Sequence, residues 1–381
     1  MPLVLGFIFF AYVLLIIFLL LGWDQVVLKT PPSSRCDETI TVLIPVRNEE
    51  ENIVKLLSDI QKQTDKSFEV IVIDDHSDDN TCQQVVAVIA NGFENLRITR
   101  LTETFGKKSA LTLGVEEAKG SLIVTTDADC RVDRLWLSGF RECFSDSSVL
   151  LAFGAVRIGA GGTLWTSMQA IELASLIGSG AGTLGLGFPT MCNGANLAYR
   201  KEAFLAVGGY SGNESIPSGD DEFLMRKIHS RFPGSIRFVA SAENVVETNP
   251  VSFTSFIHQR IRWAGKWRLN SDVYTKLLAL FVGFFHLSYL LALIMLMLRY
   301  NFILLLTVVT SKSFLEFVLL RKVMRFLNSP WSWSAFIILQ FIYPFYVVSI
   351  GVLANLKSPI WKGRKIRRTG WQINPVLRQN H

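Results

Sequence analysis

The sequence predicts an α/β domain with a mostly parallel sheet, set between hydrophobic segments that are expected to be transmembrane helices. Three observations support this fold class. Half of the 381 residues are hydrophobic and only 18% are charged, whereas soluble domains average about 25% charged residues. The longest apolar runs lie in the first and last parts of the chain. Between them, short β-branched runs alternate with amphipathic stretches, as in a parallel sheet covered by helices.

The first segment, residues 1–24, is expected to be a transmembrane helix. Residues 2–23 carry no charged side chain and are long enough to span a bilayer. They lack the basic leader and small-residue cleavage site of a signal peptide, so we expect the helix to be retained. Lys29 and Arg35 follow it, and basic residues beside an apolar helix favour the cytoplasmic side. The domain that follows is therefore expected in the cytoplasm.

Residues 37–272 are expected to form that cytoplasmic domain. Runs of strand length and β-branched composition occur at 40–46, 68–75, 96–101 and 121–129. Amphipathic stretches at 51–63 and 107–118 predict helices between them. In a sheet of this kind, ligands bind at the carboxyl ends of the strands. The polar residues at those ends are therefore the first candidates for a functional site.

Residues 273–356 are expected to be a second membrane region, followed by a basic tail at 357–381. Residues 277–298 and 326–356 are uncharged, and 301–320 are apolar except for Lys312 and Glu316. These two residues are four apart and share a helix face, so they either pair in the bundle interior or reach to the interface. The tail contains seven basic residues and no acidic one.

The charge pattern also bears on how many of these segments cross the membrane. Three crossings after a cytoplasmic domain would place the basic tail outside, which the preference of basic residues for the cytoplasm opposes. We therefore expect one segment not to cross and the tail to lie against the catalytic domain. The first candidate is 331–356, where Pro344 would seat a re-entrant turn; the second is 300–320.

Three of the predicted strands end in polar clusters. The first strand ends in residues 45–49, the second in 74–79, and the fourth in Asp127-Ala128-Asp129. Neighbouring carboxylates repel unless a cation lies among them, and an Asp-x-Asp turn offers oxygen ligands suited to Mg²⁺ or Mn²⁺. Lys107 adds a positive charge near phosphates. These features predict a site for a nucleoside diphosphate, and the net charge of +6, clustered beside apolar runs, indicates a membrane partner and no nucleic acid.

A glycine pattern at 180–185 also matches the dinucleotide-binding motif G-x-G-x-x-G. It follows the helical stretch 168–177 and no strand precedes it, so the required context is missing. We interpret it as a flexible segment on the membrane-facing side.

Taken in order, the motifs resemble those of family 2 glycosyltransferases with the GT-A fold. The resemblance rests on IPVRNEEENI (44–53), VIDDHSDD (72–79), GKKSAL (106–111) and TTDAD (125–129) in the first half. In the second half it rests on NGANLAYRKEAFLAVGGY (193–210), GDDEFL (219–224) and QRIRW (259–263). GDDEFL departs from the family's E-D-x-x-L pattern because Asp220 replaces the usual Glu.

The resemblance implies roles for individual residues. Donor-binding residues would be Pro45, Arg47, Glu49, Asp74, Asp75, Lys107, Asp127, Asp129, Gln259, Arg262 and Trp263. Asp75 beside Asp74 would contact uracil, which implies a UDP-sugar, and Asp129 with Asp127 would ligate the metal. The catalytic base would be Asp221 by its register with Leu224, with Asp220 as the alternative.

The function implied is that of a multi-pass, metal-dependent, inverting hexosyltransferase of the cell membrane. It would transfer a sugar from a UDP-sugar to a membrane lipid or lipid-linked glycan, because apolar helices flank the domain on both sides. The first alternative is a processive polysaccharide synthase, which QRIRW favours and the small number of C-terminal spans disfavours. The second alternative is a catalytically inactive glycosyltransferase-like membrane scaffold, against which the intact acidic and basic motif residues argue.

Overall fold

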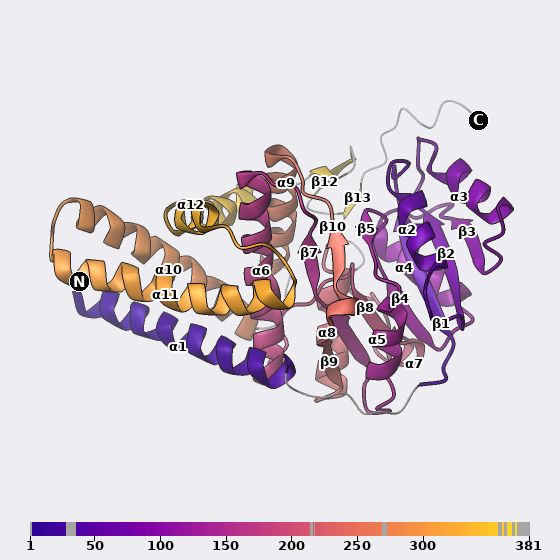
Figure 1. Cartoon of the computed structure of the whole chain (residues 1–381), viewed down its shortest axis with the longest axis horizontal. Coiled ribbons are helices and arrows are strands. Elements are labelled where there is room, and N and C mark those ends of the chain that lie inside the picture. The colour runs from indigo at the N-terminus through magenta and orange to yellow at the C-terminus, as the bar shows by residue number, and fades with distance from the viewer. Residues whose placement is uncertain are drawn as a thin grey trace.

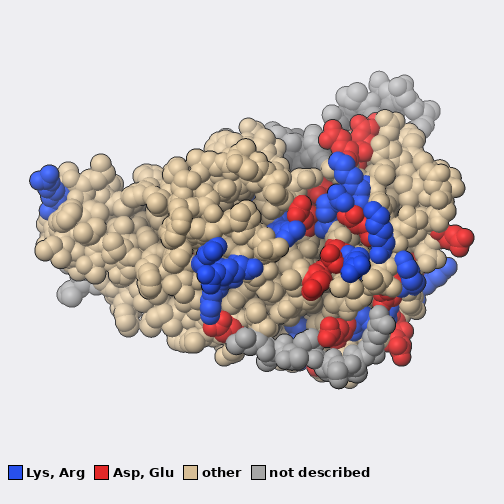
Figure 2. Space-filling model, in the orientation of Figure 1, with Lys and Arg blue, Asp and Glu red and all other residues tan. Residues whose placement is uncertain are grey.

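The structure is a computed structural model that describes residues 2–27, 36–213, 216, 218–268, 273–356, 360–361, 364–367 and 370–371. Figure 1 shows an α/β domain at one end and an elongated helical bundle at the other. On the face shown in Figure 2, charged side chains gather on the α/β domain and at its boundary with the bundle, and the surface between there and the far tip is almost free of them.

A seven-stranded sheet forms the centre of the α/β domain, with strand order β3-β2-β1-β4-β8-β6-β9. Its strands are β1 (Ile40–Val46), β2 (Phe68–Asp74), β3 (Leu96–Arg100), β4 (Leu122–Thr125), β6 (Leu151–Gly154), β8 (Leu197–Arg200) and β9 (Ile236–Val239). The first four run parallel, β8 runs antiparallel to both of its neighbours, and β6 pairs with β9 in parallel. The prediction of a mostly parallel sheet is therefore confirmed.

All four predicted strands are present, although the fourth, predicted at 121–129, ends at Thr125. They could be predicted because β1, β2 and β4 are buried nearly throughout, and strands covered on both faces appear in the sequence as continuous apolar runs. The predicted helices at 51–63 and 107–118 correspond to α2 (Ile53–Gln61) and α4 (Lys107–Glu117). The other helices of the domain are α3 (Thr81–Ala90), α5 (Trp136–Cys143), α6 (Leu164–Gly185), α7 (Lys201–Ala206), α8 (Asp220–Arg231) and α9 (Phe253–Ala264).

Three short strands form a second sheet with the order β5-β10-β7. They are β5 (Cys130–Arg131), β7 (Val156–Ile158) and β10 (Val246–Thr248). Two 3₁₀ turns, Ala242–Asn244 and Gly265–Arg268, complete the domain. The second of these turns continues α9 toward the bundle.

Helix α6 stands at the boundary between domain and bundle, across the end of α1 (Pro2–Val27) (Figure 1). The two helices touch backbone to backbone: a Cβ added to Gly22 would lie 2.0 Å from the carbonyl oxygen of Gly182. Glycine is therefore required at this crossing. The expectation of a flexible segment at 180–185 is wrong, because these small residues continue α6 and allow α1 to approach it.

Among the residues that the structure describes, four helices are long and apolar enough to cross a membrane: α1, α10 (Val273–Met297), α11 (Phe302–Phe326) and α12 (Trp333–Leu356). In Figure 1, α1, α10 and α11 lie lengthwise side by side, whereas α12 is foreshortened and lies across them at the domain end. Helix α12 packs on α10, α9 and α6.

Helix α12 is continuous through Pro344, so the expected re-entrant turn at this proline is wrong. Contacts on both sides of the proline hold the helix together. Gln340 Oε1 accepts a hydrogen bond from Lys312 Nζ at 2.9 Å, and the Tyr346 hydroxyl donates one to Glu172 at 3.2 Å. These contacts offset the backbone hydrogen bond that proline removes.

The pair Lys312 and Glu316 lies in the bundle interior. Lys312 is only 2% exposed, and its ammonium lies 2.8 Å from Glu316 Oε2. Tyr12 of α1 donates a hydrogen bond to the same carboxylate, and the amide of Gln340 donates another at 3.1 Å. Of the two interpretations of the sequence, interior pairing is therefore correct.

The described part of the tail forms three short antiparallel strands, β11 (Ile360–Trp361), β12 (Arg364–Arg367) and β13 (Gly370–Trp371). Strand β11 lies beside α9 of the α/β domain. This confirms the expectation that the tail lies against the domain, for the residues described.

Candidate active site

A cavity of about 760 Å³ opens at the carboxyl ends of the parallel strands and extends to α6, α8 and α9. Its volume is within the usual range for ligand sites, about 300–1,000 Å³. Of the residues proposed from sequence, all but Asp74 line it: Pro45, Arg47, Glu49, Asp75, Lys107, Asp127, Asp129, Asp220, Asp221, Gln259, Arg262 and Trp263. Segments more than 200 residues apart therefore meet at one cavity.

Asp74 lies beneath the cavity and does not line it. Its side chain is fully buried at the end of β2, where Oδ1 accepts the backbone N–H of Ser77 at 2.9 Å. Its other oxygen lies 3.0 Å from Arg100 Nε at the end of β3. Its position indicates that Asp74 braces the turn after β2, which the sequence could not distinguish from ligand contact.

The ends of β1 and β2 are joined by Arg47. Its guanidinium donates a 2.8 Å hydrogen bond to the backbone oxygen of Asp75 and another to that of His76, and it lies 3.1 Å from Asp78 Oδ2. Asp75 Oδ2 in turn accepts the backbone N–H of Gly106 at 3.0 Å. These hydrogen bonds hold one wall of the cavity in place. This wall carries both carboxylate and cationic groups.

Lys107 connects two acidic motifs that are far apart in sequence. Its ammonium lies 2.6 Å from Asp127 Oδ1 and 3.3 Å from Asp220 Oδ2. Burial alone would lower the pKa of Lys107, but Asp127 and Asp220 outweigh burial and raise that pKa above its ordinary value. Lys107 is therefore a permanent cation at the centre of the cavity, and it draws α8 toward the end of β4.

Asp220 and Asp221 begin α8, and their surroundings shift their pKa values in opposite directions. Burial raises the pKa of Asp220, but Lys107, Lys108 and Lys266 together hold it below its usual range. Burial and the negative charge of Asp220 raise the pKa of Asp221. The positive charge of Lys266 lowers it, but not enough to compensate, so the pKa of Asp221 lies above its ordinary value. Two adjacent carboxylates with separated pKa values can take different roles.

Asp221 is oriented by a glycine from a third segment. The backbone N–H of Gly194 donates a 3.0 Å hydrogen bond to Asp221 Oδ2. A Cβ on Gly194 would lie 2.9 Å from Asp220 Oδ2, so this close approach requires glycine. The carbonyl of Gly194 accepts a hydrogen bond from the Thr125 hydroxyl at 2.8 Å, which ties the segment to the end of β4.

Helix α9 supplies one long face of the cavity. The residues on this face recur at helical spacing and are Ser255, His258, Gln259, Arg262 and Trp263, and Lys266 follows in the 3₁₀ turn that continues the helix. Burial lowers the pKa of the Arg262 guanidinium below its ordinary value, although the negative charges of Asp220 and Asp127 raise it in part. The Lys266 ammonium lies 3.3 Å from Glu222 and 4.0 Å from Asp221. Lys266 was not predicted from the sequence, although its position one turn beyond Arg262 and Trp263 could have indicated it.

A neighbouring wall of the cavity is apolar, and it was also missed. Leu173, Leu176, Ile177 and Gly180 of α6 line the cavity, together with Met191 and Cys192. Because α6 also packs on α1, α11 and α12, this wall lies between the polar strand ends and the helices that are candidates to span the membrane. The cavity therefore combines a charged end with an apolar side.

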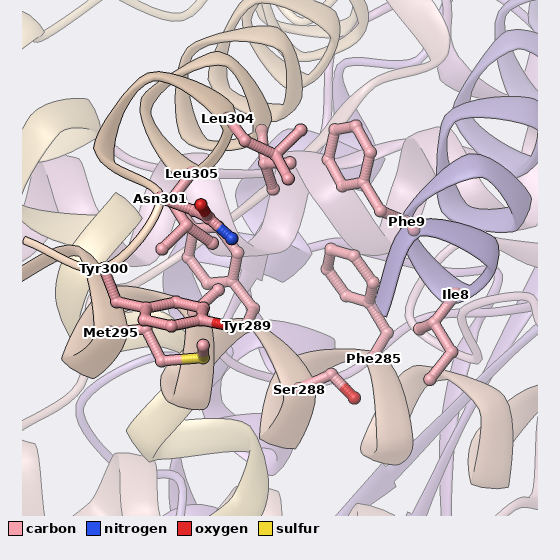
Figure 3. A pocket seen from close by; sticks show the side chains of 13 residues that line it. Ile8, Phe9, Phe285, Ser288, Tyr289, Met295, Tyr300, Asn301, Leu304 and Leu305 are labelled. Atoms are coloured by element: carbon pink, nitrogen blue, oxygen red, sulfur yellow. The ribbon is translucent and has the colours of Figure 1, made fainter. Parts of the chain in front are cut away.

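A smaller cavity of about 70 Å³ lies within the bundle between α1, α10 and α11 (Figure 3). Its walls are mainly apolar, formed by side chains such as Phe9, Phe285 and Leu304, with Ser288, Tyr289, Tyr300 and Asn301 as polar members. Among the described side chains, no carboxylate or basic group lines it. It does not offer the groups that a transfer reaction needs.

The carboxylate oxygens in the large cavity can hold a divalent cation only if a bound molecule supplies further oxygen ligands. Asp127 and Asp129 line the cavity, and one Asp127 oxygen already accepts from Lys107. Within the described residues, no group of three His, Cys, Asp or Glu side chains is arranged to hold a metal ion. One or two carboxylates with diphosphate oxygens would form the oxygen-rich coordination that Mg²⁺ or Mn²⁺ prefers.

Comparison with known proteins identifies the domain. The family model described as Glycosyl transferase family 2 matches residues 41–208. These residues form a family 2 glycosyltransferase domain. A mannosyltransferase from Pyrobaculum calidifontis, solved with GDP-Man and Mn²⁺, resembles the chain over 92% of its length and 99% of that protein, with a TM-score of 0.59 and 17% identity. The fold of the family 2 glycosyltransferase domain is thus GT-A.

Two curated relatives are similar in sequence to the family 2 glycosyltransferase domain and its surroundings. Glycosyltransferase AglE of Haloferax volcanii is 28% identical over 55% of this chain and 66% of its own length. Poly-beta-1,6-N-acetyl-D-glucosamine synthase of Staphylococcus aureus is 28% identical over 62% of this chain and 57% of its own length. The chain thus spans less than two thirds of these relatives. The family match ends at 208, before Asp220, Asp221 and QRIRW, and so does not cover these residues.

Proposed function

We propose that this chain is a membrane-anchored inverting glycosyltransferase. It transfers a sugar from a nucleoside diphosphate sugar, with UDP expected, to a membrane lipid or lipid-linked glycan. The observation that carries the proposal is the large cavity, whose charged end is formed at the strand ends and whose apolar side is formed by α6 next to the bundle. The active site faces the cytoplasm, and the chain is a multi-pass protein of the cell membrane.

The charged end accommodates the donor. Pro45, Arg47, Glu49 and Asp75 form the wall nearest to β1 and β2, which suits a nucleoside. Arg262 faces the carboxylates from α9, and its planar guanidinium is suited to diphosphate oxygens. Asp129, with Asp127 beside it, would hold a divalent cation, which would neutralise charge on the departing diphosphate when bound.

The reaction is a direct displacement at the anomeric carbon. Asp221 removes the proton of the acceptor hydroxyl, the acceptor oxygen bonds to C1, and the bond from C1 to the diphosphate oxygen breaks. The raised pKa of Asp221 strengthens it as a base. The hydrogen bond from Gly194 fixes the position of its carboxylate. A single displacement with one base inverts the configuration at C1.

Lys107 has a second role in addition to the donor contact implied by the resemblance. Its ammonium is engaged by Asp127 and Asp220, so it holds the Asp-x-Asp turn and the start of α8 together. The same contacts keep Asp220 ionised and leave Asp221 as the base.

One experiment tests the proposal as a whole. The detergent-solubilised full chain is incubated with UDP- and GDP-sugars and a membrane lipid extract, and nucleotide release and the mass of extracted lipids are measured. We expect release that depends on the extract, together with a lipid product heavier by one hexose or N-acetylhexosamine. Absence of release with every donor would favour the inactive scaffold.

A processive polysaccharide synthase is the second candidate, favoured by the similarity to the Staphylococcus aureus synthase and by QRIRW on the cavity wall. Among the described helices, α1, α10 and α11 lie lengthwise side by side and α12 lies across them, an arrangement that leaves little room to enclose a polymer (Figure 1). Product length on a gel separates the two candidates, because a synthase yields a ladder of lengths and a single transferase yields one product.

A further inference from the structure

Helix α9 has a second, buried face that the reaction outlined above does not use. Arg260 lies on this face between the motif residues Gln259 and Trp263 and is only 6% exposed. Its Nε donates a 2.8 Å hydrogen bond to Glu172 Oε1 of α6, and its Nη2 donates to Glu172 Oε2. This two-pronged pair joins α9 to the helix that forms the apolar wall of the cavity.

Arg260 also contacts two cavity-lining side chains on its own helix. Its Nη1 donates a hydrogen bond to Gln259 Oε1. Its guanidinium carbon lies 4.2 Å from the ring centroid of Trp263 and 4.3 Å from that of Phe256. A guanidinium stacked on an indole restricts the rotation of the ring. One buried side chain thus constrains both the amide and the indole that face the cavity.

The same network reaches the last hydrophobic helix. The Tyr346 hydroxyl of α12 donates a 3.2 Å hydrogen bond to Glu172 Oε1, and the Tyr346 ring lies 5.7 Å from that of Phe256. Glu172 is 4% exposed, so the pair is shielded from water and its geometry is held tightly. Glu172 therefore links α6, α9 and α12 at one point behind the cavity.

We propose that Arg260 is a positioning residue for transfer, held by Glu172 and Tyr346. It sets the Gln259 amide and the Trp263 ring in the orientation that the donor and acceptor require, and it does not touch either substrate. This inference rests on the proposed function. Lysine cannot replace arginine here, because an ammonium lacks the planar fork that binds both Glu172 oxygens, Gln259 and the indole face together.

The test compares this pair with a matched one. Arg141 and Asp65 form another buried two-pronged ion pair, at 3% and 6% exposure, and neither lines the cavity. Full-length Arg260→Lys, Glu172→Gln and Tyr346→Phe are compared with Arg141→Lys for thermal unfolding, nucleotide affinity, kcat and KM. We expect kcat to fall on the order of 10²-fold in Arg260→Lys, with nucleotide affinity nearly unchanged. Arg141→Lys is expected to lose thermal stability at unchanged kcat per folded molecule.

A spectroscopic measurement tests the inference without catalysis. The protein is labelled with 5-fluorotryptophan, and the ¹⁹F resonance of Trp263 is identified by its loss in Trp263→Phe. We expect this resonance to shift or broaden in Arg260→Lys and in the milder Tyr346→Phe, and to stay unchanged in Arg141→Lys. An unchanged resonance together with a wild-type kcat in Arg260→Lys would overturn the inference. Failure of the wild type to release nucleotide would instead refute the proposed function, and the resonance would still report on Arg260.

Discussion

The Lys107 ammonium lies 2.6 Å from the Asp127 carboxylate, which connects the start of α4 to the turn after β4. The same ammonium reaches Asp220 at 3.3 Å, so a single cation lies between the Asp-x-Asp turn and the first residue of α8. This arrangement gives the two carboxylates at the start of α8 different surroundings. Asp220 is engaged by lysine, whereas Asp221 accepts the Gly194 N–H beside the cavity and has Lys266 at 4.0 Å. The first prediction follows from that difference.

We predict that Asp221→Asn lowers the transfer rate by about two to four orders of magnitude, because an amide cannot act as a general base. Nucleotide affinity should change little, since Asp221 lies on α8, away from the ends of β1 and β2. The measurement is single-turnover transfer alongside calorimetric UDP binding. Asp220→Asn is the matched variant; if it is inactive while Asp221→Asn transfers normally, the base is misassigned by one residue.

The pH profile should report the environment of Asp221. Burial raises its pKa, so the acidic limb of kcat/KM should have its inflection above the ordinary aspartate value of about 3.9. Activity is lost as the pH falls through this pKa, because the base becomes protonated. Lys266 lowers this pKa, and Lys266→Met should therefore move the limb to higher pH. A shift toward lower pH in that variant would exclude Asp221 as the titrating group.

Divalent cations should be required for turnover. Asp129→Asn replaces a hard carboxylate ligand by a neutral amide, so we expect most activity to be lost and the requirement for Mg²⁺ or Mn²⁺ to rise. Activity is measured in excess chelator and then with each cation restored. Asp146→Asn, the same substitution at a carboxylate that does not line the cavity, is the control. Full turnover in chelator would refute the metal assignment.

The cavity face of α9 should affect transfer more than donor binding. Arg262→Ala and Trp263→Ala remove the guanidinium and the ring that face the cavity, so kcat should drop by about tenfold or more while donor affinity changes less. Ser255→Ala, on the same face two turns earlier, should behave as wild type. Wild-type turnover in a folded Arg262→Ala protein would mean that this face of α9 has only a packing role.

The membrane arrangement makes a prediction about the two ends of α11. Arg321, Lys322 and Arg325 lie in its last turns, and Lys322 pairs with Asp24 at the domain end of α1. We expect this end, the α/β domain and the tail to be cytoplasmic, and the connection between α10 and α11 to be outside. In intact cells, an impermeant thiol reagent should label Arg299→Cys and spare Gln372→Cys in the tail. Labelling of Gln372→Cys would instead place the tail outside the cell.

The strands and the strand-end residues could be predicted because both depend on local sequence. A strand that is buried on both faces is apolar throughout, and parallel strands deliver their following residues to one edge. Asp74 shows the limit of this reasoning, because its side chain turns inward to Ser77 and Arg100 while that of Asp75 faces the cavity. Adjacent residues at a strand end point in opposite directions, and the pattern of residue types does not reveal which one faces the ligand.

Other features depend on contacts between distant segments and were missed for that reason. The small residues at 180–185 indicate flexibility when taken alone, but the close approach of Gly22 makes them part of a rigid crossing. Pro344 suggests a break, yet contacts through Gln340 and Tyr346 keep α12 continuous. Glu172 is an isolated acidic residue in an apolar stretch of sequence, and only the fold shows that it holds Arg260.

The crossing of α1 and α6 has a consequence for how this protein can be handled. The face of α6 that carries Gly182 and Gly185 is covered by α1, and the face that carries Leu173 and Ile177 lines the cavity. Removing α1 to obtain a water-soluble fragment would uncover a narrow apolar strip of α6, directly behind the apolar wall of the cavity. Such a fragment would aggregate through that strip or lose the shape of its cavity, so purification should retain the first helix and a lipid or detergent belt around it.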